Sequence, residues 1–159
     1  MINMRSIVIF YSRSGNTYTV AKEIKHALNS HFREIIDYTS NRSVFEYIFP
    51  TIFDSASIEP YKIDIDYYDT IIIGTPVWFG SLTPAIKKFI DNMDFKNKNI
   101  ILFNTMKSKG GHLAMKRLVK HVQKHNGNII ATFTIKTNGS KEDIIKHTNL
   151  ALNDLNLIN

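Results

Sequence analysis

The chain has 159 residues, with 20 Lys and Arg, 14 Asp and Glu, six His and no Cys, and its formal net charge is +6. This length, with 43% hydrophobic and 21% charged residues, predicts one globular domain over residues 1–159 and excludes a disordered or fibrous chain. The lack of cysteine excludes disulfides, thiolate metal sites and cysteine nucleophiles, while the basic balance leaves nucleic acid, a membrane surface and an acidic protein open as partners.

The N-terminal segment leads directly into a short apolar run, residues 6–11. This run is too short for a signal-peptide core or a membrane span, and no small-residue cleavage site follows it. We therefore expect a soluble, cytoplasmic protein.

Short apolar runs rich in β-branched residues predict strands that are buried on both faces of a parallel sheet. These runs are 7–10, 35–36, 71–73, 100–103 and 129–133. Apolar residues with helical spacing predict helices over 17–29, 81–93, 112–125 and 141–155. In the aromatic-rich segment 41–66 we expect a short irregular helix and a long connection. The alternation predicts a three-layer α/β fold with a five-stranded parallel sheet and right-handed crossovers.

The loop between the first strand and the first helix is rich in hydroxyl groups. Its sequence is Ser12-Arg13-Ser14-Gly15-Asn16-Thr17. A strand-to-helix turn presents free backbone N–H groups and the positive end of the helix dipole, which together predict a phosphate site. The loop has neither the Gly-Lys-Ser/Thr of a Walker loop nor a G-x-G-x-x-G pattern. The alternative is that these side chains only cap the helix.

Two further loops follow predicted strands, at the sheet edge where ligands of open parallel sheets bind. The loop 74–81 carries the single tryptophan, Trp78, beside Phe79. Such aromatics either pack into the core or stack on a planar ligand, and we leave both open. The loop 105–111 ends in Gly110 and Gly111, which let a backbone approach a flat ligand closely or simply form a turn before the next helix.

The run from Ile7 to Thr17 resembles the phosphate-binding signature of flavodoxins, Ser/Thr-x-Ser/Thr-Gly-x-Thr. The turn 74–78 resembles the Gly-Thr-Pro-x-Trp turn of a flavodoxin-like subgroup. The resemblance extends from Ser6 to Leu155 and implies strand order 2-1-3-4-5 with FMN as the cofactor. The cofactor-binding residues that we predict from the three loops are Ser12, Arg13, Ser14, Gly15, Asn16, Thr17, Thr75, Pro76, Val77, Trp78, Phe79, Gly80, Thr105, Met106, Lys107, Gly110 and Gly111.

The resemblance also implies roles for single residues. Arg13 occupies the variable position of the signature, where its side chain is expected to face solvent. Gly80 is the residue whose peptide would flip so that a carbonyl accepts a hydrogen bond from N5 of the reduced flavin. Phe79 stands where a small residue is usual. Lys107 and Lys109 would place positive charge near the N1–C2 oxygen edge and raise the potential of the reduced couple.

Other site chemistries are not favoured by the sequence. His121 and His125 are four residues apart, but no Glu lies between them in the zincin arrangement, and we expect no third ligand nearby. We therefore expect a solvated basic face and no metal, and Asp91 is expected at the surface. No Gly-x-Ser-x-Gly elbow supports a serine nucleophile, so no catalytic residue is assigned.

The segment 95–141 contains ten Lys and Arg and no Asp or Glu. Such a one-signed field steers an acidic redox partner or a small anionic or quinone acceptor. The segment lacks interleaved aromatics or a nucleic-acid motif, so neither nucleic acid nor a membrane is the expected partner.

Three functions stay open at this stage. The first is an electron-transfer protein that carries one or two electrons on non-covalently bound FMN. The alternative is an FMN-dependent NAD(P)H oxidoreductase acting on a quinone or similar small acceptor, and the third is a binding module. The absence of a nicotinamide motif favours the carrier, whereas the basic flavin rim favours the reductase.

Overall fold

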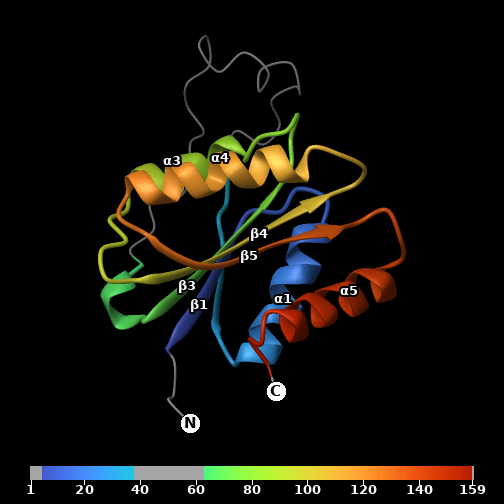
Figure 1. The fold of residues 1–159 in the computed structure, drawn as a ribbon, viewed down its shortest axis with the longest axis horizontal. Coiled ribbons are helices and arrows are strands. Elements are labelled where there is room, and N and C mark those ends of the chain that lie inside the picture. Colours follow the sequence, from blue (N-terminus) through green and yellow to red (C-terminus); the bar gives the residue numbers. More distant parts are fainter. Residues whose placement is uncertain (1–4, 38–62, 159) are drawn as a thin grey trace.

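A computed structural model describes residues 5–37 and 63–158 of the chain. Five parallel strands form one sheet in the order β2-β1-β3-β4-β5, which confirms the predicted topology (Figure 1). The strands are β1 (Ser6–Phe10), β2 (His31–Glu34), β3 (Thr70–Pro76), β4 (Asn99–Met106) and β5 (Asn128–Lys136). All adjacent pairs run parallel, so the carboxyl ends of β1, β3 and β4 share one edge of the sheet.

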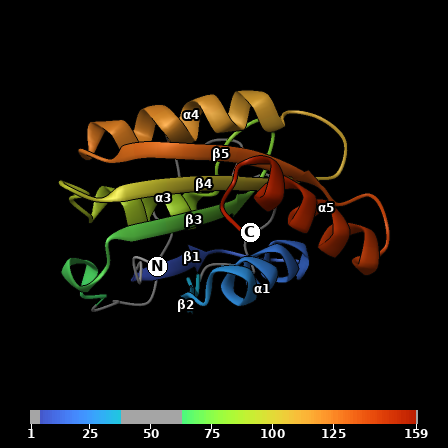
Figure 2. The same cartoon turned by 60° about the horizontal axis from the view of Figure 1, so that its bottom comes forward.

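Helices cover both faces of the sheet, as Figures 1 and 2 show together. The helices are α1 (Asn16–Leu28), α3 (Pro84–Asp91), α4 (Gly111–Lys124) and α5 (Lys141–Asp154), with a short 3₁₀ helix η1 (Ile65–Tyr67) before β3. Residues of α3 and α4 pack in one apolar cluster with the sheet, and residues of α1 and α5 pack in the other. The chain is thus a three-layer α/β fold.

The central strands are apolar on consecutive positions because both of their faces are buried. Ile71 and Ile73 of β3 pack in the cluster under α3 and α4, whereas Ile72 between them packs toward α1 and α5. All three side chains have no exposed surface. β5 lies at the edge of the sheet and alternates between half-buried and exposed residues, with Ile130 at 47% exposure. Burial on two faces therefore explains the apolar runs of β1, β3 and β4, whereas the expectation of burial on both faces was wrong for the run 129–133 in β5.

The second strand lies four residues before the position expected from the apolar pair at 35–36. β2 pairs with β1 from His31 to Glu34. Ile35 is buried just past the end of the strand, where its N–H donates to the carbonyl oxygen of Phe10 at 2.7 Å. Ile36 is 49% exposed. An edge strand with an alternating pattern does not need a continuous apolar run, and the expected position was wrong for that reason.

Helix starts follow local chemistry. α5 begins with a capping box in which the Ser140 side chain accepts from the N–H of Asp143, and the Asp143 carboxylate accepts from the N–H of Ser140. α3 begins at Pro84, later than the predicted residue 81, because residues 78–81 form a tight turn.

The short irregular helix and long connection expected within 41–66 fall mostly outside the described residues. The structure describes only 63–66 of this segment, where η1 begins. Among the helices in the described ranges, none combines the length and apolar character needed to cross a membrane.

Candidate functional site

The three loops predicted to form the site meet at one edge of the sheet. The first and third loops are joined by a hydrogen bond between the hydroxyls of Thr17 and Thr105, whose oxygens are 2.8 Å apart. The first and second loops meet where the guanidinium of Arg13 lies 5.5 Å from the ring centroid of Trp78. The second and third loops meet so closely that a Cβ built on Gly110 would lie 3.2 Å from Cα of Gly80.

Within the first loop, Gly15 is left-handed, with φ of 87°, and serves as the N-cap of α1. The Ser12 hydroxyl oxygen accepts from the N–H groups of Gly15 and Tyr18, each at 3.2 Å. In the described part of the chain, the N–H groups of Asn16 and Thr17 have no hydrogen-bond partner. No acidic side chain lies in the first turn of α1. Free N–H groups, the helix dipole and the absence of negative charge make this loop suited to an anion.

The residues of the first loop are not equally accessible. Ser14 is exposed and Asn16 is half-buried, so both can meet a ligand from solvent. Thr17 is only 2% exposed, and its hydroxyl is engaged with Thr105 on β4. The Thr17 side chain therefore also has a structural role, because its hydrogen bond links the start of α1 to the end of β4.

The second loop contains a two-residue turn with unusual backbone angles. Trp78 and Ser81 exchange two backbone hydrogen bonds of 3.0 and 2.9 Å. Between them, Phe79 has φ of 49° and Gly80 has φ of 71°, the pair of positive angles that a type I′ turn requires. Glycine adopts this region freely, whereas a left-handed Phe79 costs about 1 kcal/mol. The Phe79 side chain is 68% exposed, so the strained residue holds an aromatic ring in solvent beside the loops.

Trp78 combines the two alternatives that the sequence left open. Its ring packs edge-on against Tyr11, with centroids 5.9 Å apart, and it borders the cluster under α3 and α4. Arg13 lies over the same ring and is itself exposed, as the sequence predicted for a variable position. Trp78 is therefore half-buried, with one part in the core and another part at the loop surface.

Thr75 is placed inside the protein rather than on the loop surface. Its hydroxyl oxygen accepts from the N–H of Thr83 at 3.1 Å and lies 3.2 Å from the Thr83 hydroxyl. Both side chains have no exposed surface. This link joins the end of β3 to the N-cap of α3 and holds the turn between them. The structure brings Pro76 and Val77 to the loop surface as half-buried residues.

Packing explains both glycines of the third loop. Gly110 is the N-cap of α4 with φ of 94°, where a side chain would be strained and its Cβ would be crowded against Cα of Gly80. A Cβ on the buried Gly111 would lie 2.6 Å from Sδ of Met106. Lys107 is exposed beside them.

Three functional candidates were missed by the sequence analysis. Arg117, two turns along α4, donates from Nη1 to the carbonyl oxygen of Gly80 at 3.0 Å. Asn104 donates to the carbonyl oxygen of Gly111 at 2.9 Å, while its own Oδ1 is buried without a partner among the described residues. Thr83 anchors Thr75 as above. The contact of Arg117 spans 37 residues and those of Asn104 and Thr83 span seven and eight, and no sequence motif marks any of them.

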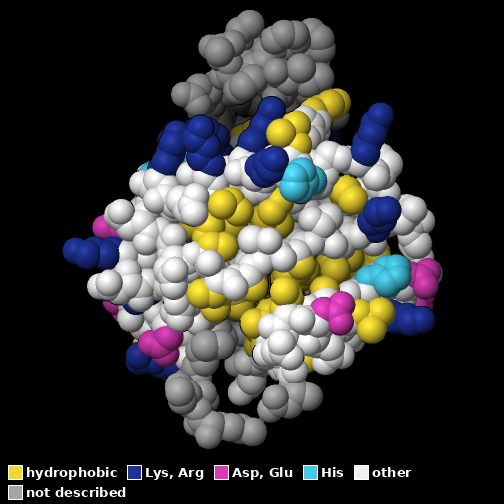
Figure 3. Space-filling view, viewed as in Figure 1, with side chains coloured by type: hydrophobic (Ala, Val, Ile, Leu, Met, Phe, Trp, Pro, Cys, Tyr) yellow, Lys and Arg dark blue, Asp and Glu magenta, His cyan; other side chains and the backbone are white. Residues whose placement is uncertain are grey.

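Four of the ten basic residues of 95–141 lie on α4. Lys116, Arg117, Lys120 and Lys124 are all exposed on α4. In Figure 3, Lys and Arg side chains gather along the upper part of the face, above a hydrophobic band that crosses its middle. The helix that begins at the third loop therefore carries a positively charged surface.

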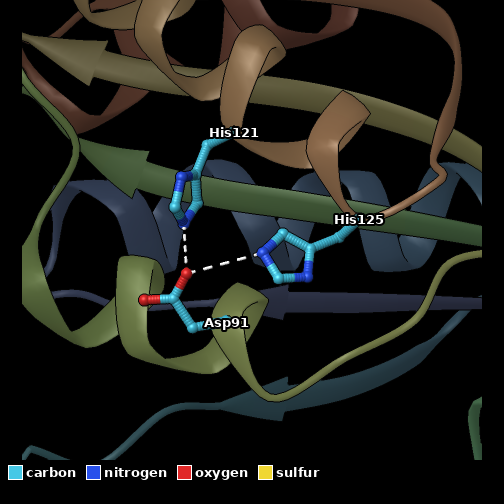
Figure 4. Close-up of side chains that lie close together, drawn as sticks. All are labelled: Asp91, His121 and His125. Atoms are coloured by element: carbon cyan, nitrogen blue, oxygen red, sulfur yellow. Dashed lines mark ion pairs between the residues drawn. The ribbon is translucent and has the colours of Figure 1, made fainter.

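A second cluster lies away from the three loops, where α3 ends and α4 ends (Figure 4). Nε2 of His121 is 2.8 Å, and Nε2 of His125 is 3.5 Å, from Oδ1 of Asp91. Burial, the largest contribution, lowers the pKa of His121 despite the nearby carboxylate. Partial burial acts to raise the pKa of Asp91, but its hydrogen bond from Lys87 and the surrounding charges outweigh burial and lower it. The expectation that the two histidines have no third ligand nearby is therefore wrong.

A cavity of about 240 Å³ lies at the opposite edge of the sheet from the loops. Its lining residues are Ile7, Arg33, Ile63, Asp64, Tyr67 and Tyr68. None of the predicted site residues borders it.

The sequence model of the family described as NADPH-dependent FMN reductase matches residues 4–139. No curated protein matches the chain.

Among solved structures, the chain is similar to a flavoprotein from Lactobacillus acidophilus NCFM in complex with FMN, at 20% identity and a TM-score of 0.73, covering 82% of this chain and 93% of that one. It is similar to oxidised flavodoxin 2 from Bacillus cereus at 18% identity and a TM-score of 0.57, covering 93% and 95%. A flavodoxin, WrbA-like protein from Agrobacterium tumefaciens gives 18% identity and a TM-score of 0.59, covering 98% and 99%. These likenesses show that the fold is flavodoxin-like.

Proposed function

The chain belongs to the NADPH-dependent FMN reductase family, and from this premise we propose that it binds FMN at the three loops and uses it to pass electrons from NADPH to a small acceptor. The observation that carries the proposal is the meeting of the hydroxyl-rich loop, the Trp78 turn and the double-glycine loop at one sheet edge. This edge is where open parallel sheets bind their ligands.

The residues present fit FMN. The free N–H groups of Asn16 and Thr17, with no acid in the first turn of α1, suit a phosphate. Trp78 and Phe79 offer aromatic surface to a planar ring, and Gly110 gives a backbone without side chains beside them. When bound, FMN supplies a ring system that takes up a hydride and gives up electrons.

The chain's own residues would bind the phosphate of FMN, form a wall beside its ring and position the turn at Gly80. The first loop binds the phosphate and fixes the register of the ligand. Trp78 is held by Tyr11 and Arg13 and forms a wall of the site. Arg117 holds the Gly80 carbonyl through a 3.0 Å hydrogen bond, so a flip of that peptide must first break this contact. Arg117 is therefore a positioning residue for the turn.

A second candidate is the electron-transfer protein of the sequence analysis, and one observation favours it. Phe79 is 68% exposed on a projecting turn beside the basic surface of α4. An exposed aromatic next to charges of one sign is a suitable docking surface for an acidic redox protein.

The first experiment measures whether the phosphate loop binds FMN. Purified, flavin-free protein is titrated with FMN and with riboflavin, which lacks the phosphate, and binding is followed by quenching of flavin fluorescence. We expect FMN to bind at least about tenfold more tightly than riboflavin, because the phosphate is a charged hydrogen-bond acceptor. Failure of both flavins to bind contradicts the function, and equal affinities contradict the assignment of the loop.

A charge variant gives the matched control. Ser14→Asp adds a negative charge at the exposed first loop and is expected to weaken FMN by about tenfold while riboflavin changes less. Asn97→Asp adds the same charge at an exposed turn at the opposite sheet edge and is expected to leave both affinities unchanged.

The second experiment separates the two candidates. The FMN-loaded protein is mixed with NADPH without oxygen, and the flavin absorbance is followed. A rapid loss of absorbance supports the reductase. A stable absorbance with NADPH and NADH, lost only on adding dithionite, overturns the reductase in favour of the electron-transfer protein.

A further inference from the structure

Two histidines of α4 and one aspartate of α3 present ligand atoms to a common point (Figure 4). Asp91 is the last residue of α3, His121 lies in the last turn of α4, and His125 is its C-cap. The three ligand atoms all lie within 4.8 Å of one another. His121 is ten residues from the start of α4, so the cluster lies about 15 Å along that helix from the loops.

The tautomer of His125 is fixed by the backbone. Its Nδ1 lies 3.0 Å from the carbonyl oxygen of Met93, which can only accept a hydrogen bond, so Nδ1 carries the proton. In the neutral ring, Nε2 then presents a lone pair toward Oδ1 of Asp91 at 3.5 Å. A lone pair facing a carboxylate is repulsive, so this nitrogen must carry either a proton or a metal ion between itself and Oδ1. Histidines that bind metals commonly donate their other ring N–H in this way.

His121 completes the set from the other side. Its Nε2 is fully buried and makes no well-aligned hydrogen bond within the described residues, although it lies 2.8 Å from Oδ1 of Asp91. A buried ring nitrogen without such a bond has free capacity for a ligand bond. Lys87 donates to Oδ2 of Asp91 at 3.0 Å and thereby leaves Oδ1 to the two histidines.

The spacing is close to that of a tetrahedral ion. Nitrogen and oxygen ligands at about 2.1 Å from a zinc ion lie roughly 3.4 Å from one another. The two observed distances to Oδ1, 2.8 and 3.5 Å, differ from this spacing by well under 1 Å, and all three ligand atoms lie within 4.8 Å of one another. Two imidazoles and one carboxylate favour zinc over magnesium or calcium, which prefer oxygen ligands alone. Three protein ligands leave a fourth position for water.

We propose that Asp91, His121 and His125 form a binding site for a zinc-class divalent ion that clamps the end of α3 to the end of α4. The two helices start from the second and third loops, so the clamp fixes the relative position of the elements that carry those loops. The site is distinct from the three loops and does not depend on the proposed function.

The test uses the purified, tag-free and flavin-free chain, titrated with zinc chloride in a non-coordinating buffer by calorimetry. We expect one ion per chain and a rise in thermal unfolding temperature with zinc but not with magnesium chloride, because an ion that binds only the folded state stabilises it. Cobalt chloride is expected to give the visible spectrum of a tetrahedral site. Absence of both heat and thermal shift at millimolar zinc overturns the proposal.

Three variants assign the ligands, and one serves as their control. His121→Gln, His125→Gln and Asp91→Asn are each expected to weaken zinc at least about tenfold. His147→Gln removes an exposed histidine on α5 and is expected to bind zinc as the parent does. Circular dichroism establishes that each variant is folded. Unchanged zinc affinity in the folded His121 and His125 variants shows that the ion binds elsewhere and overturns the assignment.

Discussion

Phe79 has a strained backbone that lowers stability, while its aromatic side chain is exposed at the protein surface. Its φ of 49° places an aromatic, L-configured residue where asparagine or glycine is usual, and no core contact compensates for this strain because the side chain is 68% exposed. Strained residues of this kind gather at functional sites. The position therefore favours a role of the ring toward a ligand or partner over a role in folding.

Replacing Phe79 by Asn is expected to stabilise the protein and weaken FMN binding. Asn-Gly is the preferred pair of a type I′ turn, so the variant gains roughly 1 kcal/mol in urea unfolding. FMN affinity, measured by fluorescence titration, falls because the aromatic surface is lost. Phe79→Ala is the control, since it removes the ring but keeps a side chain in the left-handed region. An equal gain in stability from alanine means that strain is not the cause.

The buried pair of Thr17 and Thr105 predicts a coupled effect on stability. Thr17→Val leaves the Thr105 hydroxyl without its partner and is expected to cost about 1–3 kcal/mol in urea unfolding of the flavin-free protein. The double change to valine costs less than the sum of the single changes, because no unpaired hydroxyl is then left behind. Additive single effects mean that the bond contributes nothing.

At the scale of elements, the sequence predicted most of the fold because burial on both faces leaves a continuous apolar signal, as at 71–73 in β3 and 100–103 in β4. The predicted position of β2 was wrong because apolar and polar residues alternate in an edge strand, and the apolar pair 35–36 lies past the end of this one. The three candidate loops were predicted from local chemistry, and the structure brings them together. Arg117 on Gly80 and Asp91 beside His121 were missed, since both contacts depend on how α3 and α4 pack against neighbours.

The capping box of α5 gives a pH dependence with a defined sign. The backbone N–H of Ser140, and then its hydroxyl, donate to Asp143 and lower the pKa of that carboxyl. A lowered folded pKa means that the contribution to stability is complete above the unfolded value of about 3.9 and is lost as pH falls through the folded value.

We therefore expect Asp143→Asn to be less stable than the parent in urea at pH 7, with the difference narrowing as pH falls below about 4. Asp154→Asn removes the same charge at the other end of α5, where an acid opposes the helix dipole, and is expected to cause no loss at pH 7. A gap between Asp143→Asn and the parent that stays constant from pH 7 to pH 3 contradicts a role for the carboxylate charge.

For the whole molecule, the distribution of charge matters more than the total of +6. Ten cations and no acids fall within 95–141, and four of the cations are exposed on α4, the helix that begins at the third loop. If NADPH is the electron donor, as proposed, this field attracts its phosphates. The rate of flavin reduction at limiting NADPH is then expected to fall about tenfold or more as ionic strength rises from roughly 0.01 to 0.3 M.

Charge reversal localises that attraction. Lys116→Glu combined with Lys120→Glu changes two exposed cations of α4 and is expected to slow reduction by NADPH and to flatten its salt dependence. Lys22→Glu combined with Lys146→Glu makes the same change in net charge on α1 and α5, on the opposite face of the sheet. If the field of α4 steers the donor, only the first pair has a large effect at low salt. The rate of flavin reduction is measured by stopped-flow absorbance without oxygen. Equal slowing by both pairs means that net charge, rather than the surface of α4, sets this rate.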